Sequence, residues 1–427
     1  MNIRQFAFRL QDLIKGNATT YHYKHIVDFY KNKSKSDEVL LALLSHAKLN
    51  CSFYSNISSE KILEFPIVDK TIVKESTEKF RAKNYLNSKV VTMTTSGSTG
   101  TPFTVFQDLN KKARNHADTM YFGQLGGYEL GNILLYLKIW AKQKMSNPLL
   151  YKVQNIIPVD VISLSDQQIS GLIQQIESNK ASKFNILGYV SALEHIIRYC
   201  EKRRIDKVDG NILGIITMSE GLSSETKDKL ESIFNTSAVS RYSNLENGII
   251  AQQLVGESRF MINTASYHVE IVSEHSNQVL KDGQLGRIIV TDLYNYAMPM
   301  IRYDTGDLGS IEKDGSNIYL KSVEGRKLDV LFDTKGNVIS SYIMYKNMWQ
   351  YNEISQYQLI QTHEKSYLFK INCDKAFTKE NQLIGEFKQF LGDDADFKVE
   401  YVSELPLLDS GKRRKTVNLY KTTISNV

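Results

Sequence analysis

The sequence predicts an α/β protein with a large N-terminal domain, built on mainly parallel, helix-covered sheets and a β-subdomain, and a small α+β C-terminal domain. Three observations lead to this prediction. Strand-like and helix-like segments alternate between residues 133 and 242, strands alone alternate after residue 266, and a new series of strands and helices begins after residue 325. A chain of 427 residues also exceeds what one compact core usually supports.

We therefore expect three parts. Residues 1–84 are the helical N-terminal part of the large domain, residues 85–325 are its core, and residues 326–427 are the small C-terminal domain. A helix is predicted over 109–125, where Gly126-Gly127 stops it. The alternating series then gives strands at 133–139, 159–164, 184–188, 213–218 and 238–242, with helices at 165–178, 191–203 and 223–234. In parallel sheets of this kind, ligands collect at the carboxyl ends of the strands.

The later segments predict antiparallel pairing. Two strands, 267–272 and 286–291, flank the turn Lys281-Asp282-Gly283 and form the β-subdomain. The small domain should contain a hairpin of 356–361 with 367–372, a helix over 379–391 and a strand over 397–402.

The first helical segment is amphipathic. Apolar residues recur at helical spacing with basic residues between them, namely Ile3, Phe6, Leu10 and Leu13 against Arg4, Arg9 and Lys15. The segment lacks the continuous apolar core of a signal peptide. A helix of this type could lie on a membrane, but packing on its own protein is commoner and is our prediction.

Composition excludes several classes of protein. The 53 basic residues are nearly balanced by 47 acidic ones, and Lys412–Lys415 is the one long single-sign block, so we expect no nucleic-acid partner. The longest apolar run, 133–140, is too short to span a bilayer. The three cysteines, Cys51, Cys200 and Cys373, offer no disulfide framework, which favours a cytoplasmic protein.

The segment from Thr94 to Pro102 is rich in hydroxyls and glycine, and it lies between two strand-like runs. A Walker loop needs a Gly-Lys-Ser/Thr ending and a following helix, and both are missing. Backbone N–H groups freed by glycine, with hydroxyls beside them, can surround phosphate oxygens. A flexible surface turn has the same composition, so both interpretations stay open for this segment alone.

Two polar groups follow neighbouring strands of the predicted parallel sheet, Ser219-Glu220-Gly221 and Tyr242–Asn247. Either group could be a helix cap and nothing more. The Glu246 carboxylate can help hold Mg²⁺ against phosphate oxygens. Tyr242 offers a face on which a base could stack, although a buried tyrosine is the default.

Three further signals lie downstream. Asp307, in the tight turn predicted at Thr305-Gly306-Asp307, could accept both hydroxyls of a ribose or form an Asx turn. Gly325-Arg326 looks like a joint between domains, and Gly411-Lys412 lies in a basic tail.

Together, in this order, these motifs resemble those of the adenylate-forming superfamily. Within it the chain is most similar to the phenylacetate-CoA ligase-like branch and its capsular polysaccharide biosynthesis (CapK-like) group. Ser219–Leu222, Tyr242 with Glu246, and Pro299–Asp307 carry this narrower likeness. The resemblance covers roughly residues 85 to 415.

The resemblance implies a site and a reaction. Six loop residues would grip the ATP phosphates: Thr95, Ser96, Gly97, Ser98, Thr99 and Gly100. The other expected nucleotide-binding residues are Glu220, Gly221, Tyr242 at adenine, and Asp307 and Arg326 at the ribose. Glu246 would help bind Mg²⁺, and Lys412, carried by a mobile small domain, would reach the forming bond. The acid pocket is expected near 136–140, 188–189 and 219–222.

The implied activity is ATP-dependent conversion of a small carboxylic acid to an acyl-adenylate with release of pyrophosphate. The acyl group would pass to CoA, a carrier protein, or a sugar or amine acceptor in capsular or surface polysaccharide biosynthesis. A non-catalytic nucleotide-binding scaffold or regulator is the alternative. The joint departs from the family pattern, because Leu328 stands where relatives have Asp or Lys. Some relatives in this branch bind a structural zinc through cysteines after the loop that contains the tyrosine and glutamate. This chain has no cysteine between Cys200 and Cys373, so the resemblance implies no zinc here.

Overall fold

A computed structural model describes residues 3–14, 16–32, 34, 36–95, 103–138, 140, 148–161, 164–326, 331–336, 338–339, 348, 351, 353–373, 377–406 and 415–420. The chain forms two compact units. Unit 1 comprises Met1–Thr95, Pro102–Thr305 and Gly309–Val323, and unit 2 comprises Ser96–Thr101, Gly306–Leu308 and Glu324–Val427.

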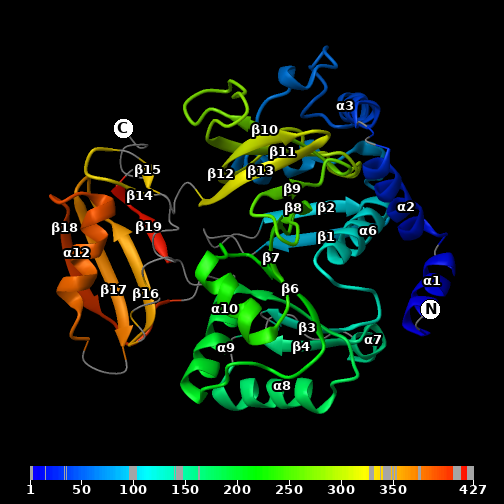
Figure 1. The fold of residues 1–427 in the computed structure, drawn as a ribbon. Coiled ribbons are helices and arrows are strands. Elements are labelled where there is room, and N and C mark those ends of the chain that lie inside the picture. The colour runs from blue at the N-terminus through cyan, green and yellow to red at the C-terminus, as the bar shows by residue number, and fades with distance from the viewer. Residues whose placement is uncertain are drawn as a thin grey trace. The chain divides into compact units, whose positions relative to one another are not determined.

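Unit 1 is built on an 11-stranded sheet with the order β10-β11-β12-β13-β9-β8-β7-β6-β5-β3-β4 (Figure 1). One end of the sheet is parallel: β3 (Ile133–Lys138), β4 (Ile156–Asp160), β5 (Phe184–Tyr189), β6 (Ile212–Met218) and β7 (Ala238–Asn244). Its helices are α6 (Leu109–Leu125), α7 (Pro148–Gln154), α8 (Asp166–Ser178), α9 (Val190–Arg203) and α10 (Ser224–Phe234). The predicted fold class, a mainly parallel helix-covered sheet with a β-subdomain and a smaller C-terminal unit, is confirmed.

The remaining strands of the large sheet form the β-subdomain. They are β8 (Gly248–Gln253), β9 (Phe260–Ile262), β10 (Tyr267–Val272), β11 (Gly286–Asp292), β12 (Tyr303–Asp314) and β13 (Asn317–Arg326). The pair β10–β11 is antiparallel, as the turn at 281–283 predicts, and β7–β8 and β8–β9 are antiparallel as well.

Local signals set the helix ends of unit 1. Ser165 begins α8 with a reciprocal capping box, in which its side chain accepts from Gln168 N and the Gln168 side chain accepts from Ser165 N. The end of α6 requires glycine, because Gly127 has φ +83° and a Cβ there would lie 2.3 Å from Leu213 O. The start of α8 at residue 165 and the stop of α6 at Gly126-Gly127 were both predicted.

The N-terminal residues are mostly helical, with α1 (Ile3–Ile14), α2 (Ala18–Lys31), α3 (Asp37–Asn50), α4 (Lys70–Glu75) and α5 (Thr77–Phe80). They precede a two-stranded antiparallel hairpin of β1 (Val90–Thr95) and β2 (Phe103–Asp108). One apolar cluster joins α3, the hairpin and the segment before β12, through Leu43, Leu44, Phe103, Val105 and Met298. The predicted phosphate-binding segment therefore lies between two strands that pair with each other, as predicted.

The prediction that the first helix, α1, packs its apolar face on the protein is wrong. Four of its large apolar side chains are exposed, with exposed fractions of 55% for Phe6, 48% for Leu10, 59% for Leu13 and 79% for Ile14, whereas Phe8 is half-buried. The residue that α1 turns inward is Asp12, whose carboxylate accepts from the backbone N–H groups of Thr19 (3.2 Å) and Thr20 (2.8 Å). A hydrogen-bonded carboxylate, not the apolar face, therefore orients this helix.

Arg302 forms a buried ion pair within the β-subdomain and hydrogen bonds to the N-terminal segment. Arg302 is 3% exposed and Glu270 is 6% exposed, and two bonds of 3.1 Å join the guanidinium to the carboxylate. The remaining guanidinium nitrogen of Arg302 donates to the carbonyls of Leu63 and Phe65, both at 3.3 Å. Arg302 itself has φ +53°, a strained conformation that surrounding contacts must hold.

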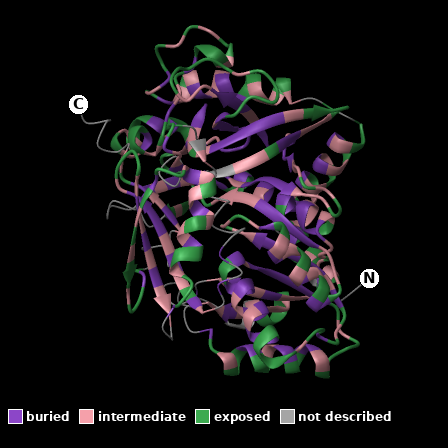
Figure 2. Ribbon diagram, turned by 60° about the vertical axis from the view of Figure 1, so that its left-hand side comes forward, coloured by how far each residue is buried: buried purple, intermediate pink, exposed green. Residues whose placement is uncertain are grey.

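Unit 2 contains a four-stranded sheet with the order β18-β17-β16-β19. Its elements are β16 (Ile354–Gln361), β17 (Ser366–Cys373), α12 (Glu380–Leu391), β18 (Asp396–Tyr401) and β19 (Thr416–Asn418), with the small pair β14 (Leu331–Phe332) and β15 (Val338–Ile339). The predicted hairpin is present as antiparallel β16–β17, and α12 packs on the sheet through Leu383, Phe387 and Leu391. Figure 2 shows how buried residues gather where helices face the strands.

Among the helices that the structure describes, none combines the length and apolar character needed to cross a lipid bilayer.

Candidate active site

The carboxyl ends of β6 and β7 bring two predicted polar groups to one edge of the sheet. The two strands are adjacent and parallel, so Ser219-Glu220-Gly221 after β6 and Glu246 after β7 leave the sheet on the same side. Ser219 has φ +73°, a left-handed conformation that turns the chain sharply at the end of β6. This is the edge at which open α/β sheets bind ligands.

Glu220 supports the start of a neighbouring helix. Its Oε2 accepts from Ser191 N at 2.6 Å, and its Oε1 accepts from Ser191 Oγ at 3.1 Å. Ser191 lies in the first turn of α9, where N–H groups lack partners within the helix and a negative charge is favourable. A helix cap was one interpretation of this group, and the hydrogen bonds of Glu220 to Ser191 fit it. Gly221 is exposed in the loop that follows.

Glu246 is held from two directions in the turn between β7 and β8. Tyr303 Oη donates to Glu246 Oε1 at 2.9 Å, and Gln107 Nε2 donates to the Glu246 carbonyl at 2.9 Å. Tyr303 and Gln107 are 1% and 2% exposed, whereas Glu246 is half-buried. Among the described residues, Tyr303 is the one donor to this carboxylate. The turn is therefore fixed while the carboxylate stays accessible.

A buried chain of polar side chains lies beneath the same turn. Tyr267 Oη donates to the carbonyl of Asn247 at 2.6 Å, and Lys111 Nζ donates to Tyr267 Oη at 3.0 Å. Lys111 Nζ also lies 2.7 Å from Asp292 Oδ2, and the side chains of this ion pair are both 0% exposed. Burial, and then the negative charge of Asp292, raise the pKa of Tyr267 well above its usual value, so the phenol keeps the proton that it donates. This chain fixes the position of the residue that follows Glu246.

Tyr242 is a strand residue that packs partly on an apolar cluster. It pairs with Ala251 across the β7–β8 hairpin, so it lies within β7 and not after it. The side chain is half-buried against an apolar cluster that includes Ile250 and Ile262. Part of the ring is therefore used in packing.

A tight turn was predicted at Thr305-Gly306-Asp307, and the structure corrects this prediction. Thr305-Gly306-Asp307 does not end a strand but lies inside β12, which continues to Asp314. Gly306 has φ +78°, and this single left-handed glycine bends the backbone locally without ending the strand. Asp307 is half-buried.

For two of the other predicted site residues the structure describes the backbone alone. Thr95 ends β1 and Arg326 ends β13, in both cases with the backbone alone described. Ser96, Gly97, Ser98, Thr99, Gly100 and Lys412 lie outside the described residues.

The segment predicted to border the acid pocket gathers a cation and two aromatic rings. Tyr136 and Trp140 meet edge to face at 5.5 Å, and Lys138 Nζ lies 4.8 Å and 4.2 Å from the two ring centroids. Burial lowers the pKa of Lys138 and raises that of Tyr136 to about 12. Lys138 lies within the apolar run 133–140 and was not predicted as a site residue.

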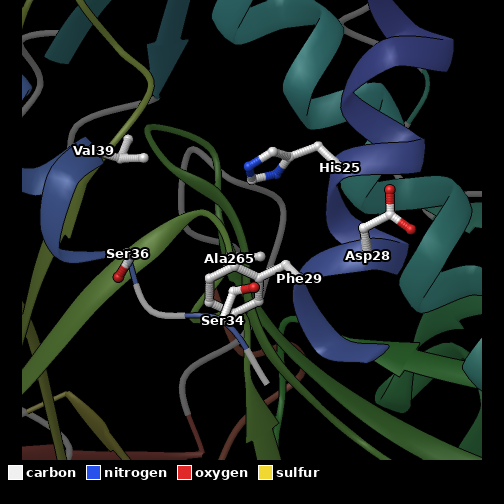
Figure 3. Close-up of a pocket in the computed structure, with 7 residues that line it drawn as sticks. All are labelled: His25, Asp28, Phe29, Ser34, Ser36, Val39 and Ala265. Atoms are coloured by element: carbon white, nitrogen blue, oxygen red, sulfur yellow. The ribbon is translucent and has the colours of Figure 1, made fainter. Parts of the chain in front are cut away.

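A cavity of about 130 Å³ lies elsewhere in unit 1 (Figure 3). Its lining consists of His25, Asp28, Phe29, Ser34, Ser36, Val39 and Ala265, none of which was predicted as a site residue. Burial and the neighbouring Arg114 lower the pKa of His25, whose Nδ1 accepts from Arg114 Nη1 at 3.1 Å. This cavity is separate from the groups at the ends of β6 and β7.

No cluster of three or more His, Cys, Asp or Glu residues suited to a metal occurs in the part of the chain that the structure describes. Glu246 nevertheless fits Mg²⁺, because this ion commonly takes one or two protein carboxylates together with substrate phosphates and water.

The fold is similar to that of several solved structures, among them a CoA ligase. A 2-hydroxyisobutyryl-CoA ligase in complex with 2-HIB-AMP aligns over 91% of this chain and 90% of its own, with TM-score 0.68 and 16% identity. ATP-bound MatB from Rhodopseudomonas palustris aligns over 78% of this chain and 67% of its own, with TM-score 0.53 and 14% identity.

The narrower likeness is found in the sequence. Residues 331–419 match the family model of the CapK C-terminal domain. Protein CapK of Staphylococcus aureus is 23% identical over 406 residues, which cover 88% of this chain and 87% of that protein. The resemblance to the adenylate-forming superfamily and its CapK-like group is confirmed by these comparisons.

Proposed function

We propose that this protein is an ATP-dependent ligase that activates a carboxylic acid as its acyl-adenylate and then transfers the acyl group. The observation that carries the proposal is the Glu246 carboxylate, held half-buried at the carboxyl edge of the sheet in the fold of acyl-CoA ligases. The transfer acceptor would be CoA, as in the similar CoA ligases, or a sugar or amine in surface-polysaccharide assembly, which the likeness to CapK supports.

In the first half-reaction a carboxylate oxygen attacks the α-phosphorus of ATP, and the bond from that phosphorus to the bridging oxygen breaks, so that pyrophosphate leaves. Two anions meet in this step, and the site must supply positive charge and fixed donors where negative charge develops. Lys412 would bridge the carboxylate and the phosphate. Residues 95–100 would donate to the phosphate oxygens.

The remaining roles follow from the same proposal. Tyr242 would stack on adenine, and Asp307 and Arg326 would bind the ribose hydroxyls. Glu246 would hold Mg²⁺, which supplies charge neutralisation at the phosphates when bound. In the second half-reaction a thiol, hydroxyl or amine attacks the acyl carbon, and AMP leaves.

The first test is ATP–pyrophosphate exchange with a panel of aliphatic, hydroxy, aromatic and amino acids. We expect exchange that needs both Mg²⁺ and at least one acid of the panel. Exchange measured without any acid is the control and should stay at background. ATP binding without exchange for any acid would contradict the ligase and favour a nucleotide-binding scaffold.

The second test uses Tyr303→Phe, which removes the hydroxyl that donates to Glu246 and keeps the ring that stacks parallel to Phe103. Partners that orient a metal ligand typically contribute 10–100-fold to metal affinity, so the Mg²⁺ concentration for half-maximal exchange should rise about tenfold or more. The measurement is a Mg²⁺ titration of exchange.

Tyr54→Phe is a matched control. Tyr54 belongs to the same apolar cluster, but its hydroxyl accepts from Ile301 N at 3.1 Å and donates to Pro299 O at 3.4 Å instead of bonding to Glu246. This variant should lose stability of about 1 kcal/mol without a change in the Mg²⁺ requirement. Equal Mg²⁺ curves for Tyr303→Phe and the wild type would argue against Glu246 as a metal ligand.

A further inference from the structure

The apolar face of α1 is exposed, whereas the apolar face of an ordinary surface helix is buried. Phe6, Leu10, Leu13 and Ile14 are spaced three or four residues apart, or adjacent, so they share one side of the helix. Their exposed fractions run from 48% to 79%. A surface helix normally turns such a stripe toward the core, and here the stripe faces outward.

The hydrogen bonds of the Asp12 carboxylate set the orientation of α1. Asp12 is 6% exposed, and its carboxylate accepts from both Thr19 N and Thr20 N at the start of α2. These N–H groups belong to the first turn of α2, where they have no partner within the helix. Rotating α1 to bury its apolar face would break this cap. The exposed stripe is therefore a stable feature of the fold.

The charges of α1 favour an anionic partner. Its basic residues, Arg4 and Arg9, are both exposed, while its one acidic residue, Asp12, is turned inward. Arg9 is three residues after Phe6 and four before Leu13, so it borders the apolar stripe. A long arginine side chain in this place can extend from an apolar layer to phosphate groups. The exposed surface of α1 therefore carries apolar side chains and two arginines, while the one carboxylate of the helix is buried.

We propose that α1 binds in the plane of an anionic lipid bilayer. Its apolar stripe would enter the boundary between headgroups and acyl chains, and Arg4 and Arg9 would lie at the lipid phosphates. With 12 residues the helix is too short to span a bilayer, and it is also short for a coiled coil with a second copy, which needs several heptads. The proposal is independent of the ligase reaction.

The test is co-sedimentation of the full chain with phosphatidylcholine vesicles that contain or lack phosphatidylserine. We expect binding to the anionic vesicles that weakens as salt is raised. The double change Leu10→Ser with Leu13→Ser should weaken this binding at least about tenfold. Arg9→Gln should reduce binding to the anionic vesicles and have little effect on neutral ones.

Leu49→Ser is the matched control, because Leu49 is 71% exposed on α3 and lies outside α1. It should bind vesicles like the wild type, and circular dichroism should show that all variants are folded. Absence of vesicle binding would overturn the proposal, as would unchanged binding by the double variant. Self-association that the double variant abolishes, without vesicle binding, would also overturn it and identify a second copy as the partner.

Discussion

ATP–pyrophosphate exchange is expected to fall by about two to three orders of magnitude in the Lys412→Ala variant. The substrate carboxylate and the α-phosphate repel each other as they approach, and a lysine ammonium is a compact cation on a stem long enough to lie between them. Because this interaction would exist mainly in the transition state, kcat should fall while the KM for ATP changes little. Steady-state exchange at saturating acid separates the two constants.

The control is the neighbouring Arg413→Ala, which removes a charge from the same basic cluster. If Lys412 acts at the reacting atoms, Arg413→Ala should change exchange only a few-fold. Lys412→Arg keeps the charge but not its compact shape and should restore only part of the rate. Full activity in Lys412→Ala would remove this lysine from the mechanism while leaving the ligase activity itself in place.

A large loss of stability is expected for Glu270→Ala. This change leaves the Arg302 guanidinium without its carboxylate, at a position where Arg302 is 3% exposed. Breaking a buried ion pair by removing one partner typically costs about 3–5 kcal/mol, because an uncompensated charge remains inside the protein. Urea-induced unfolding followed by circular dichroism measures the loss as a lower transition midpoint.

Lys313→Ala is the comparison for Glu270→Ala, because Lys313 and Asp282 form a 3.2 Å pair whose side chains are 61% and 50% exposed. Solvent screens that pair, so its loss should cost less than about 1 kcal/mol. Replacing both buried partners, Arg302→Met with Glu270→Leu, should recover much of the loss. Equal midpoints for Glu270→Ala and Lys313→Ala would contradict the expected difference.

The elements that the sequence predicted correctly depend on short-range signals. The cap at Ser165 and the stop at Gly126-Gly127 each involve residues within a few positions of one another, and their geometry follows from backbone chemistry. The alternation of strands and helices likewise predicted the parallel end of the sheet. The helix α7 was not predicted, and the direction in which α1 faces was predicted wrongly.

The support of the candidate site could not be predicted in this way. Gln107 and Tyr303 hold Glu246 although they lie far from it in the sequence, and each reads alone as an ordinary strand residue. The same is true of Lys111 and Asp292. Only tertiary packing brings these side chains together. The order of the motifs predicted the resemblance that the comparisons bear out, while the site residues and their roles stay predictions.

Glu220 illustrates how a mutation at this edge of the sheet can mislead. Both of its carboxylate oxygens are engaged with Ser191, so a Glu220→Ala change would free the first turn of α9 as well as alter the surface of the site. Reduced nucleotide affinity in that variant would not identify a ligand contact, since displacement of α9 gives the same kinetics. Ser191→Ala separates the two causes, because it removes one bond to the carboxylate and leaves the charge of Glu220 in place. The Glu220 carboxylate thus ties the start of α9 to the loop that follows β6, so a change in one displaces the other.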